Sequence, residues 1–125
     1  MKVLALDYGA ARTGVAVSDA TGTVARPLGT VARAASDKGL GRVLELIRAE
    51  QAERVVVGLP LTLRGERGEQ AEETERFVEQ LRAAVDVPVE VYDERFTSVL
   101  AGGDDARAAA HLLANYLEWA GGRER

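Results

Sequence analysis

The stretch LALDYGAARTGVAVSD near the N-terminus constrains the fold most, because an apolar run ends in an acid and a second apolar run follows two glycines. Val3–Leu6 is apolar at every position, which is typical of a central strand covered on both faces. Asp7 ends this strand, and a carboxylate is costly to bury unless something binds it. Gly9 and Gly14 indicate a tight turn before a second strand over Val15–Val17. Asp7 therefore either stabilises a turn or binds a ligand.

The rest of the chain alternates helical and strand patterns after this hairpin. A third strand over Thr23–Ala25 and Gly29–Ala32 is expected to be interrupted near Pro27 and to lie at an edge. The elements predicted next are a helix over Ser36–Gln51, a strand over Arg54–Val57, a loop over Thr62–Glu69, a helix around Thr74–Leu81, a strand over Val87–Tyr92 and a helix over Asp105–Trp119 that stops at Gly121–Gly122. This order predicts one α/β domain, residues 1–125, with a five-stranded mixed sheet (three antiparallel strands, then two parallel strands) and helices on both faces.

Composition excludes several classes of protein. The chain has no cysteine, so it has neither disulfides nor a thiolate metal site. Its N-terminal apolar run is too short for a signal peptide, and no segment reaches membrane-spanning length, so we expect a cytoplasmic protein without a membrane partner. The net charge of −4 argues at first against a nucleic-acid partner. The 14 arginines against 2 lysines suit phosphate binding, but a coding bias explains them equally well.

Acidic residues lie where three predicted elements begin or end. If the first and fifth strands run parallel, Asp7 and the neighbours Asp93 and Glu94 emerge at the same carboxyl edge of the sheet. Alternation places Asp93 and Glu94 on opposite faces, but this assignment fails if the strand stops at Tyr92, so either acid is a candidate. Asp105 lies in the middle of the buried stripe of the last helix, in its first turn, and is expected to point at the sheet.

Such a trio of carboxylates favours a divalent metal site. Mg²⁺ and Mn²⁺ prefer oxygen ligands, and a pair of such ions can activate water against a phosphodiester. Each acid also has a structural interpretation: Asp105 as a helix cap, Asp7 as a turn residue, and Asp93 with Glu94 as a solvated strand end. Structural ion networks cluster in the same way, so the residues alone leave the two interpretations equally open.

Other residues carry weaker expectations. Arg12 and Arg95 flank the acids and are candidates for phosphate contact, whereas Arg64 and Arg67 are expected to be solvated loop charges. His111 lies off the buried stripe of its helix and is expected to be exposed, so it is not a candidate base. Aromatic side chains expected to pack in or near the core are Tyr8, Phe96 and Trp119. The sequence contains no phosphate-binding P-loop motif and no HExxH motif.

Four segments together resemble the signature blocks of the YqgF/RuvX family: LALDYGAARTGVAVSD, VVVGLPLTLRGERGEQA, VPVEVYDERFTS and DARAAAHLLANYL. These Holliday-junction-resolvase-like proteins are also described as pre-16S ribosomal RNA nucleases. The resemblance implies a ribonuclease H-like fold and a catalytic, metal-binding trio of Asp7, Glu94 and Asp105. It thereby selects Glu94 over Asp93, which becomes a supporting residue. Supporting or substrate-phosphate roles are also implied for Arg95 and Thr97, while Arg12 is a candidate for phosphate contact because it flanks the acids.

The family resemblance implies an Mg²⁺- or Mn²⁺-dependent nuclease. Its first expected substrate is RNA, in the maturation of pre-16S rRNA, and its second is branched DNA. Cleavage of a symmetric four-way junction would require two active sites and hence a homodimer. The bridge Ser98–Asp104 is shorter than the segment usual in the family, which favours a second hypothesis, a non-catalytic nucleic-acid-binding factor of ribosome assembly. A nucleotide-binding ATPase ranks last, because 125 residues without a repeat cannot form its two closing domains.

Overall fold

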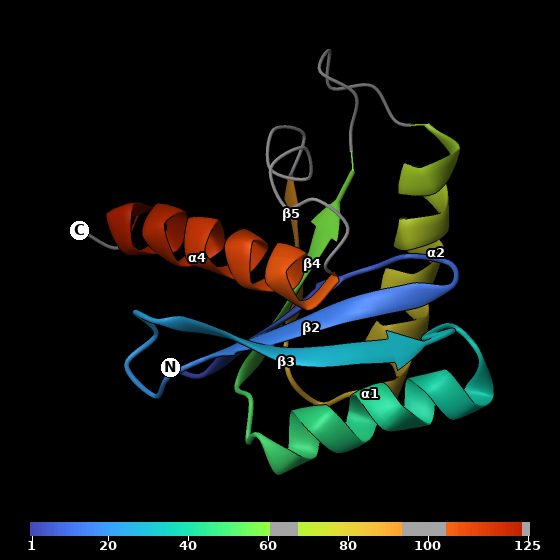
Figure 1. Ribbon diagram of the computed structural model, residues 1–125, viewed down its shortest axis with the longest axis horizontal. Coiled ribbons are helices and arrows are strands. Elements are labelled where there is room, and N and C mark those ends of the chain that lie inside the picture. Colours follow the sequence, from blue (N-terminus) through green and yellow to red (C-terminus); the bar gives the residue numbers. More distant parts are fainter. Residues whose placement is uncertain (61–67, 94–104, 124–125) are drawn as a thin grey trace.

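Five strands form one mixed sheet of order β3-β2-β1-β4-β5 in the computed structural model, which describes residues 1–60, 68–93 and 105–123 (Figure 1). The elements are β1 Val3–Asp7, β2 Arg12–Ser18, β3 Ala25–Ala32, α1 Asp37–Ala49, β4 Arg54–Leu59, α2 Glu69–Ala84, β5 Val89–Asp93 and α4 Asp105–Arg123. Strands β1, β2 and β3 pair antiparallel, whereas β4 is parallel to both β1 and β5. The predicted five-stranded mixed sheet, with three antiparallel and two parallel strands, is confirmed.

Alternation along the central strands divides the core into two layers. Leu4 and Leu6 of β1 pack with residues of α1 and α2, whereas Val3 and Ala5 pack with residues of α4. Figure 1 shows α4 crossing one face of the sheet while α1 and α2 lie on the other. The prediction of helices on both faces is confirmed. No helix in the described part of the chain is long and apolar enough to cross a membrane.

Several predicted element boundaries differ from the structure, among them those of the third strand and the last helix. The third strand is continuous over Ala25–Ala32, because its register with β2 shifts between Val15 and Ala16 and so accommodates Pro27 without a break. It is an edge strand, as predicted, and among the described strands it pairs with β2 alone. The last helix does not stop at Gly121–Gly122 but continues to Arg123, since glycine lowers helix stability without forbidding the helical conformation.

The turn between β2 and β3 is organised by Asp19, and its stability should depend on pH. The Asp19 carboxylate accepts hydrogen bonds from the Thr21 hydroxyl at 2.6 Å and from the backbone N–H groups of Thr23 and Val24 at 2.9 and 3.1 Å. These bonds hold the pKa of Asp19 well below its ordinary value. A lowered pKa stabilises the folded protein above the pKa of the unfolded chain, and this contribution is lost as the pH falls below it.

We therefore expect Asp19→Ala to lower the melting temperature at neutral pH and to have a progressively smaller effect below about pH 4, where the unfolded-state carboxyl protonates. Thermal melts of the two proteins between neutral and acid pH measure this. An equal difference in melting temperature at every pH would contradict the proposed role of the carboxylate.

Candidate active site

The first candidate residue, Asp7, lies at the carboxyl edge of the sheet on the face covered by α4. It ends β1, and its partner in β2 is Gly14. Because side chains alternate along β1, Asp7 shares a face with Val3 and Ala5, which pack against α4. Asp7 is half-buried. The predicted parallel arrangement of β1 and β5 is also confirmed, so both strands end at this edge.

Gly14 allows the start of α4 to approach this edge. A Cβ atom placed on Gly14 would overlap the carbonyl oxygen of Asp105, the first residue of α4. Directly opposed residues of an antiparallel pair have Cβ positions about 4.5–5.5 Å apart. The backbone of Asp105 therefore lies about one strand spacing from Asp7, on the same face of the sheet. The sequence pattern suggested that Gly14 closes a turn, but Gly14 lies inside β2, and its lack of a side chain provides space for the helix.

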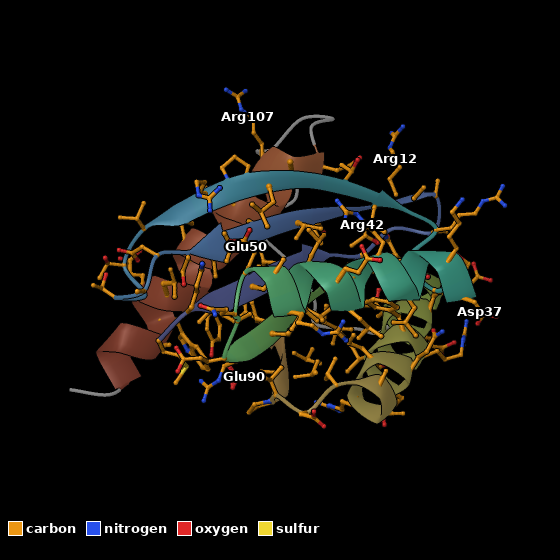
Figure 2. All side chains as sticks on the ribbon, turned by 90° about the horizontal axis from the view of Figure 1, so that it is seen from below. Arg12, Asp37, Arg42, Glu50, Glu90 and Arg107 are labelled. Atoms are coloured by element: carbon orange, nitrogen blue, oxygen red, sulfur yellow. The ribbon has the colours of Figure 1, made fainter. Side chains whose placement is uncertain are left out.

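Arg12 forms an ion pair with Asp105. Its Nε atom donates to Asp105 Oδ2 at 3.0 Å, and the two side chains are 67% and 34% exposed. Figure 2 shows Arg12 and Arg107 projecting on the side of the sheet away from α1. Sequence reasoning did not single out Arg107, which lies in the first turn of α4 and is exposed. The signal available in the sequence was its position two residues after Asp105, the acidic residue that begins the helix. The described site thus combines two carboxylates with two exposed or partly exposed arginines: Asp7, Asp105, Arg12 and Arg107.

The buried Thr13 stabilises the β1–β2 loop that precedes Arg12. The Thr13 hydroxyl lies 3.4 Å from the N–H of Gly9, which donates to it, and 3.5 Å from the carbonyl oxygen of Gly9. The N–H of Arg33, after β3, donates to the carbonyl oxygen of Ala11 at 3.0 Å. These bonds connect the β1–β2 loop to the start of β2 and to the residue after β3, so the backbone of Arg12 has a defined position.

Strand β5 separates its last residues between the two faces. Val89 and Val91 pack with the α1 and α2 layer, whereas Tyr92 packs with the α4 layer. The strand continues through Asp93, so alternation places Asp93 on the face opposite to Asp7. Asp93 is exposed. Other predicted site residues, Glu94, Arg95 and Thr97, lie outside the described residues, as do Arg64, Arg67, Phe96 and the bridge Ser98–Asp104.

The described donor set suits a hard divalent cation but is incomplete. Asp7 and Asp105 offer carboxylate oxygens, the donors that Mg²⁺ and Mn²⁺ prefer. One Asp105 oxygen accepts from Arg12, so this carboxylate already has cationic compensation. Within residues 1–60, 68–93 and 105–123, no group of three His, Cys, Asp or Glu side chains is placed to hold a metal ion. The third predicted ligand, Glu94, lies outside those ranges.

The aromatic residues and His111 that the structure describes lie largely as expected. Tyr8 is buried and stacks on Phe77 with a ring-centroid distance of 4.6 Å, as expected for core packing. His111 is exposed, also as expected. Trp119 packs near the core, as expected, with its ring centroid 5.9 Å from that of the buried Tyr116, but it is 43% exposed. It lies beside Tyr92, at 5.6 Å between ring centroids, and no local periodicity links a residue of β5 with the end of α4.

A model of the family described as "RuvX: Holliday junction resolvase" matches residues 1–119. A candidate pre-16S rRNA nuclease of Chloroflexus aurantiacus is 48% identical over 99 residues, which cover 79% of this chain and 65% of that protein. The chain thus spans under two thirds of the length of that relative. A candidate pre-16S rRNA nuclease of Thermoanaerobacter pseudethanolicus is 38% identical over 134 residues and covers 94% of this chain and 96% of its own. That alignment is longer than the 125-residue chain, so the relative has residues that this chain lacks.

Solved structures show the same fold. Thermus thermophilus RuvC in complex with a Holliday junction superposes with a TM-score of 0.61 at 21% identity, over 98% of this chain and 96% of that one. The fowlpox virus resolvase superposes with a TM-score of 0.58 at 11% identity, over 96% and 99% of the two chains. Such low identities show the fold alone. With its family match over residues 1–119, the chain belongs to the RuvX family and has a RuvC-like ribonuclease H fold.

Proposed function

We propose that this chain is a divalent-metal-dependent nuclease that hydrolyses phosphodiester bonds in RNA, with the precursor of 16S rRNA as its first substrate. The observation that carries the proposal is the approach of Asp105 to Gly14 beside Asp7. It brings carboxylate-bearing residues that are 98 positions apart in sequence to the same face and edge of the sheet. The names of the relatives support pre-16S rRNA as the substrate.

The residues that would hold the metal are Asp7, Asp105 and Glu94, the last on the sequence resemblance alone. A bound Mg²⁺ or Mn²⁺ supplies an activated water and neutralises charge on the phosphate. Asp7 is half-buried at the end of β1. Asp93 is proposed only as a supporting residue, because alternation places it on the opposite face. Arg95 and Thr97 remain proposed contacts to substrate phosphate.

Arg12 has two proposed roles, and both use its guanidinium. In the free protein, Arg12 compensates the charge of Asp105. Its 67% exposure also leaves it accessible to a phosphate of the substrate, and a guanidinium matches phosphate oxygens as a fork. The two roles predict different consequences for stability and for cleavage.

We expect Arg12→Gln to lower the unfolding free energy by less than about 1 kcal/mol, because exposed ion pairs contribute little. Cleavage should fall by roughly 10- to 150-fold, the equivalent of losing a charged hydrogen bond of about 1.5–3 kcal/mol. Arg12→Lys is the matched control, because lysine keeps the charge but cannot bind phosphate as a fork. Its cleavage rate should lie between those of the wild type and Arg12→Gln. Cleavage assays and denaturant melts of the three proteins measure this. Unchanged cleavage in Arg12→Gln would remove Arg12 from the site.

The function itself is tested with labelled substrates and controlled metal content. The full chain, stripped of metal, is incubated with single-stranded RNA spanning a 16S precursor end or with a four-way DNA junction, in EDTA, Mg²⁺ or Mn²⁺. We expect cleavage of the RNA that requires added metal and stops with EDTA. Cleavage of the junction alone would favour the resolvase described for the family model. Binding of RNA without cleavage under any condition would favour the ribosome-assembly factor and contradict the nuclease.

A further inference from the structure

Three aromatic residues form a cluster on the α4 face: Tyr92, Tyr116 and Trp119. Their ring centroids lie 5.6–5.9 Å apart, and the rings of Tyr92 and Tyr116 meet edge to face. Tyr116 is 1% exposed, whereas Trp119 is 43% exposed. Arg54 Nη1 donates to the Tyr116 hydroxyl at 3.0 Å, which fixes the buried member of the cluster. The cluster therefore holds an exposed indole in a defined orientation against two supporting rings.

The register of the sheet relates this aromatic cluster to Asp7. Leu6 pairs with Val57, so Asp7 and Gly58 are the next positions along β1 and β4, and Gly58 pairs with Tyr92. Neighbouring strands lie about 4.8 Å apart, which puts the backbones of Asp7 and Tyr92 roughly 10 Å apart. Both side chains belong to the α4 face, and Gly58 between them has none. The sheet thus has no side chain on this row between the candidate catalytic acid and the aromatic cluster.

We propose that a nucleobase of a single-stranded RNA stacks on Trp119 and so directs the strand across Gly58 toward Asp7. The inference rests on the proposed nuclease function and names how its substrate is held. Stacking on an aromatic ring suits any base, because every base has a π face. It also suits an acidic chain: a net charge of −4 repels the phosphate backbone overall, whereas stacking is little affected by charge.

The chain offers a direct reporter, because Trp119 is its single tryptophan. Asp7→Asn protein, which should bind without cleaving, is titrated with a short single-stranded RNA while tryptophan fluorescence and RNA anisotropy are recorded together. We expect saturable quenching of Trp119 with the same midpoint as the anisotropy change. An otherwise identical abasic strand should bind with little quenching. Single-stranded DNA of the same sequence should quench, whereas duplex RNA, whose bases are already stacked, should not.

Substitutions then test whether the stack contributes affinity. Trp119→Ala should weaken RNA binding by about 5- to 150-fold, the range expected for one base stack, and Trp119→Phe should restore most of it. Val24→Ala is the matched control, since Val24 is also exposed but lies in the turn before β3, and it should bind as the parent does. The factor lost in Trp119→Ala should be the same at about 50 and about 200 mM salt, whereas the factor lost in Arg12→Gln should shrink as salt rises.

Each of the following outcomes would overturn the stacking proposal, and one would overturn the nuclease proposal as well. RNA binding by anisotropy without quenching overturns the stacking proposal and leaves the nuclease proposal intact. Neither binding nor cleavage by the wild-type chain overturns both. Tryptophan emission that shifts when the protein alone is diluted would show that a second copy covers Trp119, which also overturns the stacking proposal. Equal RNA affinity in Trp119→Ala and Val24→Ala, with both variants folded by thermal melt, overturns it as well.

Discussion

Gly14→Ala should destabilise the protein and nearly abolish cleavage. The added Cβ would overlap the carbonyl oxygen of Asp105, so the start of α4 must move away from β2. Overpacking of this kind costs about 1–3 kcal/mol, which for a chain of this size lowers the melting temperature by roughly 5–10 °C. Displacement of Asp105 by about 1 Å from Asp7 should reduce cleavage about 100-fold. Thermal melts and metal-dependent RNA cleavage measure the two effects.

Gly41→Ala is the matched control for this substitution. Gly41 lies within α1, and a Cβ there would meet no atom within 4 Å. Alanine has the higher helix propensity, so this variant should gain about 0.5–1 kcal/mol and keep full activity. A lower unfolding free energy for Gly14→Ala together with a higher one for Gly41→Ala would support a close approach of α4 at Gly14. A Gly14→Ala protein with wild-type stability and cleavage would show that α4 does not depend on that approach.

Asp7→Asn and Asp105→Asn should each reduce metal-dependent cleavage by at least about 100-fold. An amide keeps the shape of the carboxylate but loses the charge that holds a divalent cation, and such a cation contributes several kcal/mol of transition-state stabilisation. Asp105→Asn should change the unfolding free energy by less than about 1 kcal/mol, because its ion pair with Arg12 is partly exposed. Cleavage rates at saturating Mn²⁺, alongside denaturant melts, separate the loss of chemistry from the loss of folding.

Glu45→Gln provides the control for removing a carboxylate. Glu45 lies on α1, on the opposite face of the sheet, and is 65% exposed in a surface pair with Arg42. This variant should cleave at the wild-type rate, and its parallel purification also reveals any contaminating nuclease. If Asp7→Asn and Asp105→Asn cleave as fast as Glu45→Gln does, the two aspartates are not at the reacting centre.

The order of strands and helices along the chain and the edge at which Asp7 lies were predictable because they depend on local patterns. The apolar run that ends at Asp7 predicted a central strand, and the change from strand to helix periodicity after Ser36 predicted crossover connections. Parallel strands must then end at one edge of the sheet. Asp7 and the acids after Tyr92 could therefore be predicted from the sequence to lie at the same edge. Asp105 was placed in the first turn of its helix by the same periodicity. The family resemblance added the choice of Glu94.

What sequence reasoning missed depends on contacts between distant elements. Gly14 has the composition of a turn residue, and its contact with the start of α4 follows only from how the helix crosses β2. The partial exposure of Trp119 was not predicted, because helix periodicity gives the direction of a side chain but not where the helix leaves the sheet. Its contact with Tyr92 joins β5 to the end of α4, and the ion pair between Arg12 and Asp105 joins residues 93 positions apart.

The most direct measurement for the central claim is Mn²⁺ binding to the metal-stripped full chain by isothermal titration calorimetry. Wild type and Glu45→Gln should bind Mn²⁺ with the same affinity, because Glu45 lies on the opposite face. Asp7→Asn and Asp105→Asn should each lose most of that affinity, since both aspartates are proposed ligands of one site. Equal Mn²⁺ affinity in all four proteins would contradict the assignment of a metal site to this edge of the sheet.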